Sequence, residues 1–88
     1  MAIKGIEVLE NTLQQHNGKD AIISISHKLY GNQKIKCTLN CIVNGNHIGF
    51  QVNDNQKIYM YRDEIKEFCV SPSLFFMDDV MRVDLQIK

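Results

Sequence analysis

The sequence lacks the motifs that mark the common enzymes, metal sites and phosphate-binding loops. Its 3 histidines are scattered, with neither an HxH nor an HExxH spacing, and its 5 glycines form no phosphate-binding loop. No serine lies in a GxSxG elbow. The acidic pairs Asp63-Glu64 and Asp78-Asp79 fall in expected bends and turns, where adjacent carboxylates do not face each other across a site. We therefore expect a protein that is not an enzyme, with no metal, no cofactor and no small-molecule substrate.

Long apolar runs and an excess of charge are also absent. No run reaches the roughly 18 residues that a membrane-spanning helix needs, and Lys4, Glu7 and Glu10 lie where a secretory signal would have its apolar core. The 10 lysines and arginines balance the 10 aspartates and glutamates, and 44% of the residues are apolar. Such a composition is typical of a folded domain and not of a disordered chain. We predict a soluble, cytoplasmic protein that does not bind membranes.

Cysteine is too sparse and too irregular to build a disulfide framework. Cys37, Cys41 and Cys69 are an odd set without a CxxC spacing. On one extended strand, Cys37 and Cys41 would lie roughly 13 Å apart, which is too far for a disulfide bond. We interpret the three cysteines as small buried apolar side chains.

A helical period is present only at the start of the chain. Apolar residues recur at helical spacing on one side of residues 3–16, and polar residues occupy most of the other side. Gly18 follows as the expected C-cap, because glycine adopts the left-handed conformation without steric cost. An isolated helix of this length is marginal in water, so we expect it to pack on a sheet. The residues of the apolar side are Ile3, Ile6, Leu9 and Leu13.

Two-residue alternation, the period of a β-strand, dominates the rest of the sequence. Turn residues such as Asn44-Gly45-Asn46 separate the alternating segments, and Asn-Gly favours a tight hairpin. Residues 74–77 fit either a strand or a single helical turn. The last strand has the strictest alternation, and we expect it to close or edge the sheet. The predicted strands cover about residues 20–30, 33–43, 47–53, 57–62, 65–70 and 80–87.

The pattern as a whole predicts one domain, residues 1–88, that is mainly β. A chain of 88 residues buries only about 60–70% of its unfolded surface, which suffices for one thin core. A small sheet buries more apolar area and hides its edges when it curls up. We therefore predict an N-terminal α-helix followed by a small five- or six-stranded antiparallel barrel.

The order of helix, Gly18-Lys19, strand, hairpin and three-stranded meander resembles the Sm-like and SH3-like small β-barrels. It is more specifically similar to the bacterial Veg family, in which a helix precedes such a barrel. The resemblance covers about residues 6 to 70 and implies a bacterial origin. The chain lacks the Gly and Asn pattern of the Sm motifs, so the resemblance implies a fold and not an RNA-binding ring. The residues that carry it are Gly18-Lys19 and Tyr59-Met60-Tyr61-Arg62-Asp63-Glu64-Ile65.

Charge is distributed unevenly along the chain. Residues 21–53 contain 3 lysines, 2 histidines and no acid, whereas residues 54–88 contain 7 acids against 5 basic residues. The first hairpin is therefore locally basic, and its candidate nucleic-acid contacts are Lys28, Tyr30, Lys34 and Lys36. The zero net charge argues for a solvated polar face instead, because nucleic-acid binding by counterion release usually needs a basic excess.

The segment Ile58-Tyr59-Met60-Tyr61 is apolar on both faces of its predicted strand. The N-terminal helix could cover the second face, or another protein molecule could. Exposed tyrosines are good interface anchors because they bury much area at low entropic cost. Tyr59 and Tyr61 are the candidate protein interface. Our leading hypothesis is a non-enzymatic small-barrel interaction module that binds a protein partner or itself, and the alternative is an RNA or single-stranded DNA binder that uses the basic hairpin.

Overall fold

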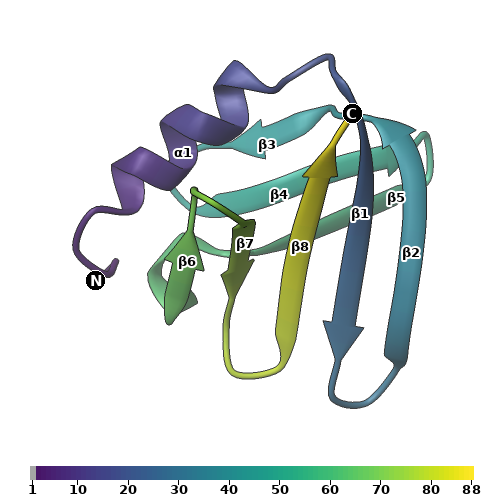
Figure 1. Ribbon diagram of the computed structural model, residues 1–88. Helices are drawn as coiled ribbons and strands as arrows, with labels where there is room; N and C mark the ends of the chain where they lie inside the picture. The colour runs from purple at the N-terminus through teal and green to yellow at the C-terminus, as the bar shows by residue number, and fades with distance from the viewer. Residues whose placement is uncertain (1) are drawn as a thin grey trace.

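The computed structural model describes residues 2–88 and shows one helix and eight strands in two antiparallel sheets (Figure 1). One sheet has five strands in the order β2-β1-β8-β7-β6, and the other has three in the order β3-β4-β5. The predicted mainly-β architecture with an N-terminal helix is confirmed. The elements are α1 (Ile6–Gln15), β1 (Asp20–His27), β2 (Gly31–Thr38), β3 (Cys41–Val43), β4 (His47–Asn53), β5 (Gln56–Tyr61), the 3-10 turn η1 (Arg62–Glu64), β6 (Glu67–Cys69), β7 (Leu74–Met77) and β8 (Met81–Ile87).

Helix α1 lies across one end of the two sheets and contacts β3 and β6 (Figure 1). Three of the four residues predicted for its apolar side, Ile6, Leu9 and Leu13, are buried. Ile3 precedes the helix and packs against the core, because Gly5 adopts a left-handed φ of 84° and starts the helix later than the predicted residue 3. The Glu10 carboxylate accepts two hydrogen bonds from the Arg62 guanidinium, at 3.1 and 3.2 Å. This ion pair fixes α1 to the turn that follows β5.

The five-stranded sheet starts from the expected hairpin of β1 and β2. Its register runs from Asp20 opposite Thr38 to His27 opposite Gly31, and residues 28–30 form the turn. The terminal strand β8 pairs with both β1 and β7. The prediction that this strand closes or edges the sheet was therefore wrong. Alternation identified the strand correctly, but the position of a strand in the sequence does not determine its neighbours in a sheet.

The predicted strand 33–43 is divided between the two sheets at Leu39 and Asn40. The buried Leu39 exchanges backbone hydrogen bonds with the segment after α1, since its N–H donates to Lys19 and its carbonyl accepts from Gly18. β3 then forms the predicted hairpin with β4, and the Asn44 side chain accepts hydrogen bonds from two backbone N–H groups in that turn. Alternation continues through the division, which is why one long strand was expected.

The two sheets pack face to face, and β3, β4 and β5 run across the strands of the larger sheet (Figure 1). Phe50 of β4 and Phe76 of β7 meet between them with ring centroids 6.1 Å apart, and neither is exposed. The larger sheet ends at β2 and β6, and the smaller one ends at β3 and β5. The two sheets therefore do not form a closed barrel, and they contain eight strands in place of the predicted five or six. Residues 74–77 form a strand, β7, which adds to the predicted number.

All three cysteines are free and half-buried, rather than buried as we predicted. The Cys41 thiol lies against α1 and donates a hydrogen bond to the Leu13 carbonyl at 3.2 Å. Burial raises the pKa of the Cys41 thiol to about 11. A thiol that is half-buried in this way stays protonated at neutral pH.

We expect Cys41 to react with iodoacetamide much more slowly than Cys69. The thiolate is the reactive species, and a pKa of about 11 leaves on the order of 100-fold less thiolate at pH 8 than the ordinary pKa of about 8.5. Mass spectrometry of peptides from a labelling time course on the native protein measures both rates, with Cys69 as the internal control. Equal rates for Cys41 and Cys69 would contradict the expectation.

The same burial predicts a loss of stability at alkaline pH. The Cys41 thiol ionises from about pH 8.5 in the unfolded chain but only near about 11 in the folded one. Its folded pKa is raised, so its contribution to the free energy of unfolding is complete below about pH 8.5 and is lost as the pH rises towards about 11. Urea unfolding between pH 8 and pH 10.5 should show a weaker pH dependence for Cys41→Ala than for the wild type.

Candidate functional site

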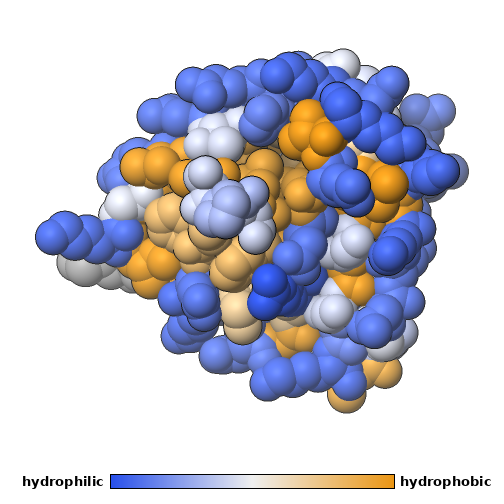
Figure 2. Space-filling model, in the orientation of Figure 1, coloured by the Kyte–Doolittle hydropathy of each residue, from blue (hydrophilic) through white to orange (hydrophobic). Residues whose placement is uncertain are grey.

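The four candidate nucleic-acid contacts lie on two different surfaces. Lys34 and Lys36 pair across the ladder with residues 24 and 22, so they lie on the outer face of the larger sheet. That face is largely hydrophilic over β2, whereas an apolar area covers β6 and β7 (Figure 2). Lys28 and Tyr30 belong to the β1–β2 turn, and Tyr30 is 85% exposed. The structure brings the two lysines of β2 together and separates them from the aromatic ring.

His27 organises the β1–β2 turn. Its Nδ1 accepts hydrogen bonds from the backbone N–H groups of Leu29 and Tyr30, at 3.0 and 3.3 Å. Its ring also contacts the Tyr30 ring, with centroids 4.6 Å apart. The interpretation of His27 as a residue at a strand end agrees with these contacts.

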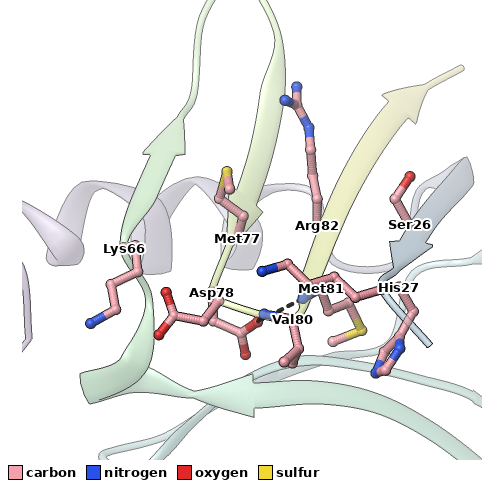
Figure 3. A pocket seen from close by; sticks show the side chains of 10 residues that line it. Ser26, His27, Lys66, Met77, Asp78, Val80, Met81 and Arg82 are labelled. Atoms are coloured by element: carbon pink, nitrogen blue, oxygen red, sulfur yellow. Dashed lines mark hydrogen bonds between the residues drawn. The ribbon is translucent and has the colours of Figure 1, made fainter.

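A cavity of about 380 Å³ lies beside the β7–β8 turn and is lined by both His27 and Asp78 (Figure 3). Oδ1 of Asp78 accepts hydrogen bonds from the backbone N–H groups of Val80 and Met81, at 2.9 and 2.8 Å. His27 and Asp78 both hold turns by these backbone bonds, and Figure 3 shows Met81 and Val80 between them. Within residues 2–88, no group of three or more His, Cys, Asp or Glu side chains could hold a metal ion.

Tyr59 and Tyr61 lie on the outer face of the smaller sheet, together with His47. The exposed fractions of the two tyrosines are 45% and 54%. The His47 ring lies 4.9 Å from the Tyr59 ring and 5.0 Å from the Tyr61 ring. We call these three residues the aromatic cluster. Helix α1 packs against β3 and β6 instead, so the described part of the chain leaves this cluster open to solvent.

The register of β4 and β5 places the tyrosines. Tyr59 is opposite Gly49 and Tyr61 is opposite His47. Gly49 is buried, and its lack of a side chain lets β5 approach closely, because a Cβ there would meet the Ile58 carbonyl oxygen and the Tyr59 backbone. The large ring beside a glycine on the neighbouring strand is a known way to hold a register. Sequence reasoning found the tyrosines but missed His47. The register of the turn, with Asn53 opposite Gln56, would place Tyr61 opposite residue 48, and the irregularity between Gln51 and Asn53 shifts it to His47.

The backbone of β5 has one free edge within residues 2–88. The N–H group of Gln51 in β4 donates to the carbonyl of Asn40, on the side of β3. The N–H group of Arg62, just after β5, donates to the carbonyl of Asn46 at the start of β4. Since successive residues of a strand direct their N–H and C=O groups to opposite sides, the even-numbered residues of β5 face β4. The odd-numbered residues, Lys57, Tyr59 and Tyr61, therefore direct theirs away from the sheet.

A groove runs along this free edge. It has a volume of about 460 Å³ and is lined by residues 57–61 of β5 on one side and by the β1–β2 hairpin and the β7–β8 turn on the other. The ends of β1, β2 and β8 that carry these turns extend past β5 (Figure 1), so their inner faces form a shelf. Ile25, Val80 and Met81 belong to this shelf. We call this feature the β5 groove.

The electrostatics of these surfaces are local. Arg82 lies on the outer face of the larger sheet, where it pairs with Asp84 at 3.0 Å and its guanidinium lies 4.0 Å from the centroid of the Phe75 ring. The hydrogen bonds that Arg82 donates to the Asp84 carboxylate raise the pKa of Arg82. Along the β5 groove, Lys57 lies at one end, and Glu64 and Asp78 lie at the end near Tyr61.

Comparison of the chain with models of known protein families, with curated proteins and with solved structures gives no match in any of the three. No helix within residues 2–88 has the length and apolar character needed to cross a membrane.

Proposed function

We propose that the protein is a non-enzymatic interaction module that binds a protein partner or itself through the aromatic cluster and the free edge of β5. The observation that carries this proposal is the exposure of Tyr59 and Tyr61 on a strand whose outer edge is unpaired within residues 2–88. Tyrosine buries a large area at low entropic cost, and it is enriched at protein interfaces. An unpaired strand edge is in turn a template for another strand.

Tyr59→Ala/Tyr61→Ala is expected to lose the binding of protein partners that the wild type retains. Affinity purification from the native host after nuclease treatment, with quantitative mass spectrometry, measures the bound proteins, and sedimentation velocity at micromolar concentration measures self-association. Tyr61→Ala alone is a second variant, because it leaves the Gly49–Tyr59 contact intact. Val8→Ala is the control, since Val8 is 51% exposed on α1 and does not line the groove beside β5. Equal binding by the wild type and the double variant would contradict the proposal.

One observation supports the nucleic-acid alternative. Lys34 and Lys36 are exposed on the same face of β2 and form no ion pair within residues 2–88. Titration with mixed RNA and single-stranded DNA oligonucleotides at low and moderate salt tests it, because phosphate contacts weaken steeply with salt. Binding at low salt that Lys34→Gln/Lys36→Gln weakens would favour this alternative, and no binding at low salt would end it.

We also propose that the two sheets are an open relative of the Sm-like and SH3-like small barrels, and that the chain is related to the Veg family. The support is the order of the elements: a helix, a hairpin, and then a strand that passes from one sheet to the other at Leu39 and Asn40. Passage of a strand path between two crossed sheets is how small β-barrels and orthogonal sandwiches turn their corners.

A further inference from the structure

The smaller sheet has room for a fourth strand in the β5 groove. Strands in a sheet lie about 4.7–4.9 Å apart, and the groove offers a volume of about 460 Å³ beside an unpaired edge. We propose that a single extended peptide segment of a partner protein docks there, antiparallel to β5. This inference rests on the proposed function and specifies the partner of the same site. Addition of a strand to a sheet edge is a common mode of peptide recognition, in which main-chain hydrogen bonds give the affinity.

The shelf beneath the groove prevents two copies of the chain from pairing through their β5 strands. Antiparallel pairing of two identical strands requires a twofold axis perpendicular to the smaller sheet. That axis would place the larger sheets of both copies in one layer. The ends of β1, β2 and β8 extend past β5 (Figure 1), so the two shelves would occupy the same space. An isolated strand has no second layer and avoids this clash.

The pleat of β5 determines which side chains the peptide needs. Peptide residues opposite Lys57, Tyr59 and Tyr61 exchange backbone hydrogen bonds with them, and their side chains lie on the outer face beside the aromatic cluster. The intervening peptide residues project towards the shelf, as Ile58 and Met60 do. The shelf is apolar there, with Ile25, Val80 and Met81. These intervening positions therefore take β-branched apolar residues.

The charges at the two ends of the groove determine the direction of the peptide. In antiparallel pairing its amino end lies near Tyr61, where Glu64 and Asp78 line the groove, and its carboxyl end lies opposite Lys57. A basic residue at the amino end and an acidic residue at the carboxyl end are complementary to these groups. Antiparallel pairing is also slightly more stable per residue than parallel pairing.

The test uses two synthetic peptides with blocked ends and the same composition, Lys-Thr-Val-Thr-Val-Glu and Glu-Thr-Val-Thr-Val-Lys. NMR chemical-shift titration of the full chain measures both affinities. We expect the first peptide to bind about tenfold more tightly, because the exchange replaces an exposed ion pair by charge repulsion at each of the two ends. Equal affinities, or no binding of the first peptide, would overturn the proposal.

N-methylation distinguishes strand addition from simple occupation of the groove. Methylation of the second threonine removes the N–H group that faces Tyr59, and we expect it to abolish binding. Methylation of the second valine removes an N–H group that faces away from β5, and we expect binding to remain within about threefold. Binding that responds equally to both methylations contradicts docking as a strand.

A pair of variants places the peptide on the shelf. Val80→Lys puts a charge in the groove and should weaken peptide binding at least fivefold. Val8→Lys on α1 is the control, since the exposed fractions of Val80 and Val8 are 48% and 51%. Equal effects of the two variants would remove the shelf from the site.

The outcomes also separate this inference from the function on which it rests. Protein capture that depends on Tyr59 and Tyr61 but does not compete with the first peptide overturns the strand inference alone. No capture that depends on the tyrosines overturns the proposed function. A dimer in sedimentation that Val80→Lys dissociates would assign the groove to a second copy and overturn the inference.

Discussion

Gly49→Ala is expected to lower the free energy of unfolding by about 3 kcal/mol, because overpacking of a tight site costs about 1–3 kcal/mol and occasionally more. A Cβ at position 49 would meet the Ile58 carbonyl oxygen and would lie 2.5 Å from Tyr59 Cα. Both neighbours are backbone atoms of β5, so β4 and β5 would have to separate. Urea unfolding followed by far-UV circular dichroism measures the loss.

Gly45→Ala is the matched control for this prediction. Gly45 lies in the β3–β4 turn, and a Cβ there would meet nothing within 4 Å. Its effect on stability should stay within about 0.5 kcal/mol, as is usual for surface positions. A similar loss of stability in both glycine variants would show that the close approach of β4 and β5 does not cause the loss in Gly49→Ala.

The same contact connects stability to the candidate site. The centroids of the Tyr59 and His47 rings lie 4.9 Å apart, and separation of β4 and β5 would move the two rings away from each other. The near-UV circular dichroism of the tyrosines should therefore change in Gly49→Ala but not in Gly45→Ala. Peptide binding to the β5 groove should fall in parallel, because the free edge belongs to the strand that moves.

Much of the local structure could be predicted from the sequence. The buried side of α1, the residues 47–53 of β4 and the β3–β4 turn agree with the periodicity and turn residues that predicted them. These features depend on neighbours in the sequence, and side-chain period reports them directly. The position of β8 between β1 and β7 depends on distant pairing, so alternation alone could not reveal it.

Of the candidate site, too, one part could be predicted from the sequence and another part could not. Tyr59 and Tyr61 were predicted because a strand with apolar residues on both faces implies a cover on each side. The β5 groove could not be predicted, because its shelf comes from Ile25 of β1 and from Val80 and Met81 near β8. These residues approach β5 only after the strand path has passed between the sheets at Leu39 and Asn40. A closed barrel would have left β5 without a free edge.

Phe76→Ala is expected to lower the free energy of unfolding by about 3–5 kcal/mol, as truncation of a buried phenylalanine does in other cores. Phe76 has no exposed surface, and its ring lies 6.1 Å from that of Phe50 on the opposite sheet. The truncation would leave a cavity between the two sheets. At about 0.05–0.15 kcal/mol per residue, a chain of 88 residues has a stability of only about 4–13 kcal/mol, so this single change removes a large part of it.

Phe75→Ala is the control for this prediction, because it removes the same side chain from the adjacent position. Phe75 faces outward beneath Arg82, with the guanidinium 4.0 Å from the ring centroid, and its loss leaves no cavity between the sheets. We expect it to cost less than half as much as Phe76→Ala in urea unfolding. If Phe76→Ala does not fold, Phe76→Leu keeps most of the volume and should still be less stable than Phe75→Leu. Equal losses at the two positions would mean that the contact between the sheets is not the main source of stability.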